Sequence, residues 1–198
     1  MIDITGCRDI TSLQAVLFMV LFLHAFENLS TCHTYIGIAL RTSLRMGLHR
    51  ELCGGFNPIE RETRRRVFWA IRKLDIHVSA ALGLPVMLSN DDIDQALPIE
   101  VDDEYITNDA VLSMPPGQTS LNAASNAHTR LMLILSDVIK HVYPIKGSEQ
   151  SVQGSSKASC SISHATILAI ERDLADWLDK LPMSLRQWQE GLPIEVLR

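Results

Sequence analysis

Seven histidines, four cysteines and a run of carboxylates are the side chains of this 198-residue chain that could support catalysis or bind a metal. The histidines are spread singly, and the chain has no glycine-rich phosphate loop and no G-x-S-x-G or H-E-x-x-H motif. The acidic run 91–94 lacks the glycine and the trailing glutamate of an EF-hand loop. The sequence therefore predicts that the chain is not an enzyme.

The cysteines do not have the spacing of a metal site. Cys7, Cys32, Cys53 and Cys160 are far apart and form no close pairs, whereas structural zinc requires closely spaced ligands. We expect free thiols in a reducing compartment, and no metal or other cofactor in this chain.

The stretch RETRRRVFWAIRKLD, residues 61–75, concentrates six of the eighteen Lys and Arg residues. It could bind nucleic acid, or it could be a helix face that is solvated or ion-paired. The formal net charge of −5 argues against a molecule that binds phosphate over its whole surface. On a helix that turns by about 100° per residue, Phe68 and Trp69 fall outside the apolar stripe, so the helix should be covered on more than one side.

Arginines buried beside these aromatics need carboxylate partners, because an unpaired desolvated charge is strongly destabilising. An acid-rich segment follows the helix, and we expect it to fold back so that one of its first carboxylates pairs with Arg64–Arg66. The candidate carboxylates are Asp91, Asp92 and Asp94. A solvated basic face and a DNA-reading face remain the alternatives.

The elements that position these side chains are predicted to be helices. The segment from Thr11 to Glu27 is apolar nearly all round, which indicates a helix enclosed by other helices. Its longest apolar run, residues 15–23, is too short to span a bilayer, so no membrane segment is expected. Ser30 can cap a second helix, and Asn57 with Pro58 can start a third that stops at Gly83.

The remaining chain predicts an acidic connection and further helices. From Leu84 to Met114 the helical periodicity fails, which indicates a long acidic extended connection between the third and fourth helices. We expect helix from about 120 to 142, a disordered Ser/Gly/Gln-rich loop over about 145–161, and further helices over about 163–190, the last carrying Trp188. The fold class is all-α, one domain of about five or six helices, with a helical core over about 9–98 and 120–142.

Three stretches of the chain resemble the signature of a known family. LRMGLHRE (44–51), ERETRRRVFWAIRKLD (60–75) and GLPVMLSNDDIDQALP (83–98) are similar, in order and spacing, to the regulatory domain of fungal zinc-cluster transcription factors, also called the middle homology region. The matching positions are Gly47, Leu48, His49, Arg50, Arg65, Arg66, Phe68, Trp69, Leu74, Asp75, Gly83, Pro85, Asp92, Ile93, Asp94, Leu97 and Pro98. Ile76 and Leu84 stand where the family commonly has basic residues.

The resemblance implies an all-helical regulatory domain in a nuclear transcription factor that regulates RNA polymerase II transcription. In that family DNA is bound through a separate amino-terminal binuclear zinc cluster, which needs six closely spaced cysteines that this chain lacks. Zinc and DNA contact are therefore expected only in such a cluster, and the chain is expected to be a fragment that lies inside the domain. The expected partner is a small-molecule effector or a co-regulator protein, and a metabolite-sensing helical domain remains the alternative function.

Overall fold

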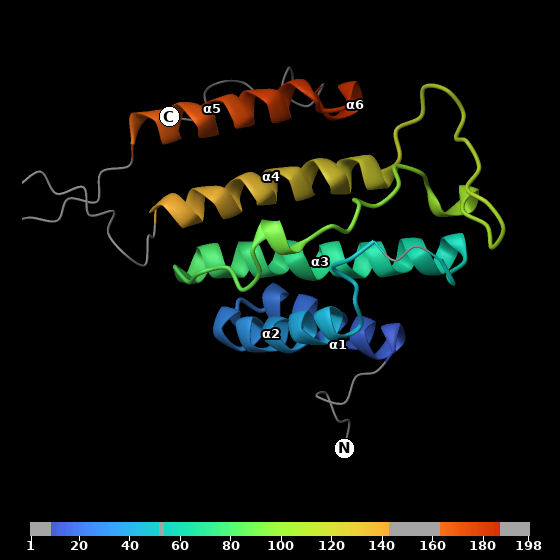
Figure 1. Cartoon of the computed structure of the whole chain (residues 1–198), viewed down its shortest axis with the longest axis horizontal. Coiled ribbons are helices and arrows are strands. Elements are labelled where there is room, and N and C mark those ends of the chain that lie inside the picture. Colours follow the sequence, from blue (N-terminus) through green and yellow to red (C-terminus); the bar gives the residue numbers. More distant parts are fainter. Residues whose placement is uncertain (1–8, 52–53, 143–162, 187–198) are drawn as a thin grey trace, which may run out of the picture.

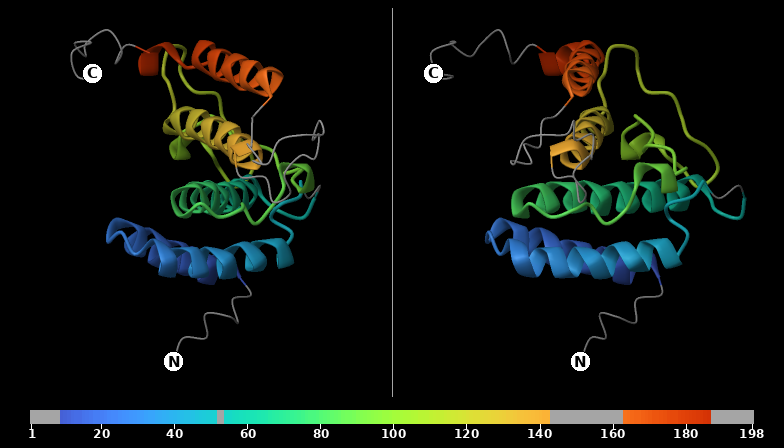
Figure 2. Two further views of the ribbon diagram at one scale, coloured as in Figure 1. Left: turned by 90° about the vertical axis from the view of Figure 1, so that its left-hand side faces the viewer. Right: turned by 60° about the vertical axis from the view of Figure 1, so that its left-hand side comes forward.

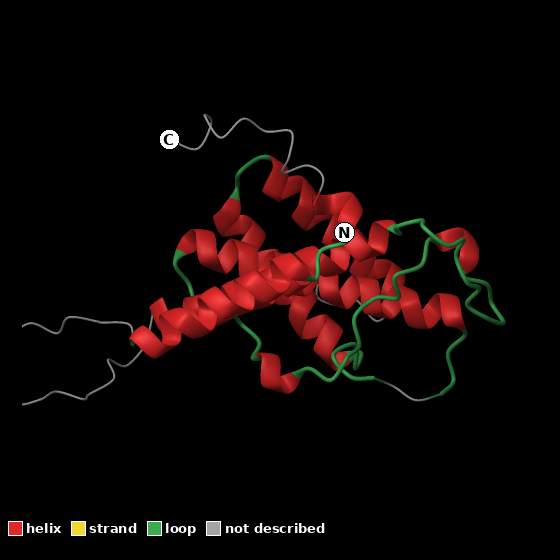
Figure 3. Cartoon of the chain, turned by 90° about the horizontal axis from the view of Figure 1, so that it is seen from above, coloured by secondary structure: helices red, strands yellow, loops and turns green. Residues whose placement is uncertain are grey.

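The computed structural model describes residues 9–51, 54–142 and 163–186 as a layered stack of helices (Figure 1). The first two helices form one layer, and α3, α4 and α5 follow as successive layers, an order that both views of Figure 2 also show. In this part of the chain the helices are α1 (Ile10–Ala25), α2 (Leu29–Arg45), α3 (Pro58–Leu82), α4 (Leu121–Val142), α5 (His164–Asp179) and α6 (Met183–Arg186). The all-α prediction is confirmed, and Figure 3 shows only helices and loops among the described residues.

The bounds of α3 are set by local side-chain and backbone chemistry. The Asn57 side chain accepts a hydrogen bond from the Glu60 amide (2.8 Å), and the Glu60 side chain accepts one from the Asn57 amide (3.3 Å), which is a complete capping box. Pro58 occupies the first turn, where its missing N–H costs nothing. At the other end Gly83 adopts a left-handed φ of 66°. The predicted start and stop of this helix are confirmed.

The cap of α2 differs from the prediction. Asn28, and not Ser30, accepts the hydrogen bond from the Thr31 amide (3.3 Å), so Ser30 lies inside the helix. Asn28 holds that position because the turn from α1 is very short, with Glu27 in a left-handed conformation at φ 57°. The predicted loop over 145–161 and the helical turn with Trp188 lie outside the described residues.

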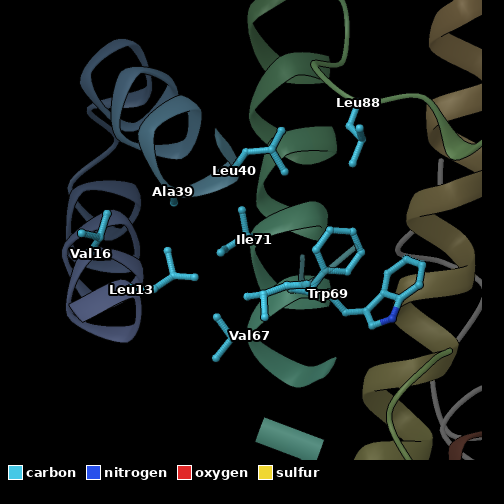
Figure 4. Close-up of a cluster of buried hydrophobic side chains, with 10 residues drawn as sticks. Leu13, Val16, Ala39, Leu40, Val67, Trp69, Ile71 and Leu88 are labelled. Atoms are coloured by element: carbon cyan, nitrogen blue, oxygen red, sulfur yellow. The ribbon is translucent and has the colours of Figure 1, made fainter. Parts of the chain in front are cut away.

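Apolar side chains from α1, α2 and α3 form the main core (Figure 4). Leu13, Leu40 and Ile71 are buried between these helices, while Trp69 lies on the opposite side of α3, toward α4. A separate cluster around Ile76 joins α3 to α4. Helix α3 is therefore covered on more than one side, as its two off-stripe aromatics predict.

Helix α1 is not enclosed as expected. Its side chains Leu13, Val16 and Val20 are buried, but Phe18 and Phe22 on the other face are 71% and 62% exposed. The sequence pattern could not show this, because a helix that is apolar on both faces gives no contrast between a covered and an open side.

The segment between α3 and α4 contains two short 3-10 helices, Asn90–Asp92 and Asp103–Tyr105. Asn90 accepts a hydrogen bond from Arg72 of α3, and farther along the segment the Ile99 amide donates to Glu62, nearer the start of α3. The segment therefore runs back along α3 toward the start of that helix. On its other side it is bonded by Asn122 and Asn126 of α4. The segment thus fills the groove between α3 and α4.

Candidate functional site

Hydrogen bonds join residues 48–51, which follow α2, to the chain between α3 and α4 (residues 84–120), called the acidic segment below. The amides of Asp94 and Gln95 both donate to the His49 carbonyl (3.1 Å each). The Gln95 side chain, only 9% exposed, donates to the carbonyls of Leu48 (3.0 Å) and Arg50 (3.1 Å). The Asp94 carboxylate accepts the Glu51 amide (2.7 Å). The first and third stretches of the family signature therefore lie side by side.

The second stretch of the signature is attached to this pair through Arg65. Its guanidinium donates to the Glu51 carboxylate and lies 3.9 Å from a carboxylate oxygen of Glu62. The other Glu51 oxygen accepts the Ala96 amide (3.3 Å), and the Trp69 indole N–H donates to the Ala96 carbonyl (2.8 Å). One glutamate thus links the arginine helix to the segment that covers it.

Arg66 and Glu62, which lie one helical turn apart on α3, form a second link to the acidic segment. The Arg66 Nε donates to a Glu62 oxygen at 2.9 Å, and the same oxygen accepts the Ile99 amide (3.1 Å). Arg66 also donates to the exposed carboxylate of Asp103. The Glu62 side chain is 3% exposed. It is a buried carboxylate held by two arginines and one backbone amide.

The predicted partners of Arg64–Arg66 are wrong. No described ion pair joins these arginines to Asp91, Asp92 or Asp94; the carboxylates that pair with them are Glu51, Glu62 and Asp103. The reason is direction: the segment crosses α3 near Arg72 first and reaches the level of Arg66 only at Asp103.

Arg64 forms none of the described salt bridges. Its Nη2 donates to the Met46 carbonyl (2.8 Å), and its guanidinium lies over the Phe56 ring, 4.3 Å from the centroid. Burial lowers the pKa of the Arg64 guanidinium, and the nearby Glu60 charge offsets part of that shift. Arg64 therefore holds the turn between α2 and α3 rather than the acidic segment.

A fully buried ion pair, missed by the angular analysis of the sequence, lies farther along α3. Arg72 donates to Asp75 at 2.8 Å, and both side chains are 0% exposed. The second Arg72 nitrogen donates to Asn90 (2.9 Å). Burial raises the pKa of the Asp75 carboxyl, while Arg72 and the Met87 amide act in the opposite direction. The one available signal was the spacing of three between an arginine and an aspartate on one helix.

Burial and contacts differ among the other signature residues and their neighbours. Phe68 is 0% and Trp69 is 6% exposed, and their rings meet edge to face with centroids 5.4 Å apart. The Pro98 carbonyl accepts the Asn126 side chain (2.7 Å), whereas Pro85 is exposed. Ile76, which replaces a basic residue common in the family, is 1% exposed in the cluster between α3 and α4.

One open hollow brings four of the predicted signature residues together. Its volume is about 570 Å³, and it lies where the end of α2 meets the acidic segment. The lining residues are Leu44, His49, Arg50, Leu88, Asp91, Asp92 and Asp94. Three carboxylates, a histidine and an arginine in its lining allow it to bind a small polar ligand through charge and hydrogen bonds.

The described residues contain no cluster of three or more His, Cys, Asp or Glu side chains arranged to hold a metal ion. Cys32 is buried, with its sulfur 3.6 Å from the Val20 carbonyl, and burial raises the pKa of its thiol. Four scattered cysteines do not fit the six-cysteine zinc cluster that the resemblance implies elsewhere. Among the described helices, none is both long and apolar enough to cross a membrane.

Comparison with known proteins identifies the family. Residues 2–190 match the model of the fungal specific transcription factor domain. The chain belongs to this family. No solved structure matches it.

Relatives of the domain are whole transcriptional regulators. The chain is 47% identical to Activator of stress genes 1 of Saccharomyces cerevisiae, over all of this chain and 20% of that protein. It is 43% identical to Activator of stress genes protein 1 of Candida albicans, over 94% of this chain and 20% of that protein. It is 28% identical to Transcriptional activator protein acu-15 of Neurospora crassa, over 88% of this chain and 18% of that protein. The domain thus spans about a fifth of the length of these curated relatives and is a regulatory domain of a fungal transcription factor.

Proposed function

We propose that this domain is the part of a nuclear transcription factor that regulates RNA polymerase II transcription without touching DNA itself. The observation that carries the proposal is the internal pairing of the arginines of α3. The side chains of Arg65, Arg66 and Arg72 are 12%, 30% and 0% exposed, and each is bonded to a carboxylate of the same chain. A DNA-binding helix presents its arginines to phosphates and base edges, and this helix presents them to glutamate and aspartate.

The arrangement is suited to passing a conformational change from the acidic segment to the helical layers. Helix α3 packs against α1, α2 and α4, and Glu51 and Glu62 tie it to the acidic segment. A ligand or co-regulator that displaced the segment would therefore act on α3 and on every layer that packs against it. DNA contact in the whole protein is assigned to a separate zinc-cluster domain, and no catalytic role is proposed. The relatives named as activators support a role in activating transcription.

Replacement of Arg65 with Glu tests the internal pairing. The new carboxylate would face Glu51 and Glu62, so we expect the free energy of unfolding to fall by about 3–5 kcal/mol, in the range for breaking a buried ion pair. Urea unfolding measures this, and fluorescence anisotropy with duplex DNA at low salt is expected to show no binding by the unmodified domain. Unchanged stability of the variant, together with DNA binding that the substitution abolishes, would contradict the proposal.

A sensor of small polar metabolites is the second candidate function, favoured by the hollow of about 570 Å³ that His49, Arg50, Asp92 and Asp94 line. A ligand at 100 times its dissociation constant would add about 2.7 kcal/mol to the free energy of unfolding. Thermal-shift measurements with amines, amino acids and organic acids test this. A genuine shift should disappear in the Asp92→Ala variant, because that exposed carboxylate lines the hollow. If no compound in the panel shifts the melting temperature, the sensor function is contradicted, while the proposed regulatory role of the domain is not affected.

A further inference from the structure

Helix α1 has two apolar faces, and only one of them is used within the described chain. Leu13, Val16 and Val20 are at most 4% exposed against α2 and α3. Phe18, Phe22 and Phe26, spaced by four residues, are 71%, 62% and 69% exposed. At about 100° per residue these three rings lie within about 80° of arc, on the side of the helix opposite the buried residues. In both views of Figure 2, α1 and α2 form the outermost layer of the described helices, with no described helix below them.

The open face has the spacing of a helix-pairing seam. Its exposed residues at spacings of four and three are Thr11, Ala15, Phe18, Phe22 and Ala25. This is the alternation of a heptad seam, which selects another helix as the partner. From Ile10 to Ala25 the helix contains no Asp, Glu, Lys or Arg, so no charge opposes an identical helix.

The three exposed rings of the open face could form the apolar centre of a dimer interface; Phe18 and Phe22 belong to the seam, and Phe26 lies beside it, 4.6 Å from Phe22 between ring centroids. Counting roughly 200 Å² for each phenylalanine, the exposed parts of the three rings amount to about 400 Å². A standard interface buries about 800 Å² on each partner, with an apolar centre and a more polar rim. The three rings alone would thus supply about half of one side.

We infer that the occupant of this face is a second copy of the chain, paired through α1 in the antiparallel direction about a two-fold axis level with Val20. Phe18 and Phe22 are equally distant from that position, so Phe18 of each copy packs on Phe22 of the other. Ala15 and Ala25 face each other at the two sides, where small side chains allow the helices to approach closely. The aromatic centre and the small flanks make the seam complementary to itself, which a two-fold interface requires.

Sedimentation equilibrium of the whole 198-residue chain over a hundredfold range of concentration tests the pairing. The unmodified chain is expected to form a dimer, and Phe18→Lys or Phe22→Glu should raise the dissociation constant of the dimer at least tenfold with unchanged helical circular dichroism. The matched control is Leu121→Glu, which changes a leucine that is 83% exposed on α4 and should leave the dimer intact.

Mixing the two variants tests the direction. In the antiparallel pair the Lys of one variant meets the Glu of the other while the second aromatic layer stays whole, so the mixture should regain at least part of the lost dimer. A parallel pair would not bring these positions together. A chain that stays monomeric throughout, or a dimer that tolerates both substitutions, overturns the proposal and assigns the aromatic face to a different partner. A mixture that stays monomeric overturns the antiparallel arrangement.

Discussion

Replacement of Asp75 with Ala is expected to lower the free energy of unfolding by about 3–5 kcal/mol, the range measured when one partner of a buried ion pair is removed. Asp75 and Arg72 are both 0% exposed, and 2.8 Å separates their charged atoms. Without the carboxylate, Arg72 would keep Asn90 as its described hydrogen-bond partner and would remain a buried cation that has lost its directly bonded carboxylate, with the charge of Asp137 acting on it only from a greater distance. Because a domain of this size has a net stability of about 5–15 kcal/mol, this loss is a large part of the whole, and the midpoint of urea unfolding should fall clearly.

The double variant Arg72→Met, Asp75→Leu separates the loss of a partner from the loss of the pair. It removes both charges and fills similar volume with apolar atoms, a change that is often neutral or stabilising in buried pairs. We expect urea unfolding to place it within about 1.5 kcal/mol of the unmodified chain. If the single and double variants were equally unstable, the effect would come from packing around Phe68 and Val78 rather than from the unpaired charge.

The helix ends were predictable because their causes are local. Asn57, Pro58 and Gly83 fix the bounds of α3 within a few residues of sequence, through a side-chain cap, a fixed φ and a left-handed stop. The same reasoning failed at α2 by two residues, where Asn28 and Ser30 are both good caps and the length of the preceding turn decides between them. The side-chain types identify the residues that could cap a helix, and the length of the preceding turn decides which of them does.

The partners in the ion pairs could not be predicted from the sequence alone. Burial of arginines among carboxylates followed from the off-stripe positions of Phe68 and Trp69, but the choice of carboxylate depends on how far the acidic segment travels along α3 before it turns. That path is set by contacts to α4, such as the Asn126 side chain on the Pro98 carbonyl. Contacts to a helix that comes later in the chain leave no signal in the spacing of residues 61–104.

The same region contains hydrogen bonds that join the three stretches of the family signature. The His49 carbonyl accepts backbone amides of the third stretch, the Asp94 carboxylate accepts the Glu51 amide, and the Glu51 carboxylate accepts a hydrogen bond from Arg65. These residues are spaced along the chain so that three separate stretches close on one another. The three stretches of the signature thus meet at the junction of α2, α3 and the acidic segment.

Glu62 has a far more buried side chain than Glu51 at that junction, and its removal should also be strongly destabilising. Its buried carboxylate is bonded to Arg66 (2.9 Å) and the Ile99 amide (3.1 Å), and lies 3.9 Å from Arg65. We expect Glu62→Ala to lower the free energy of unfolding by about 3 kcal/mol, because hydrogen bonds to charged groups contribute about 1.5–3 kcal/mol and two arginines lose a partner. The Ile99 amide should also exchange hydrogen faster, since its acceptor is gone.

Two further variants show whether charge or geometry gives the effect. Glu62→Gln keeps a carbonyl oxygen for the Ile99 amide but removes the charge, so it should lose about 2 kcal/mol while Ile99 stays protected from exchange. Asp103→Asn removes the charge of the Arg66 partner that is 84% exposed, and should change stability by less than about 1 kcal/mol because water screens an exposed pair. Equal losses at Glu62 and Asp103 would mean that burial does not strengthen the pairing. In that case the arginines of α3 would be available to other partners, DNA phosphates included, and the proposed function would be contradicted.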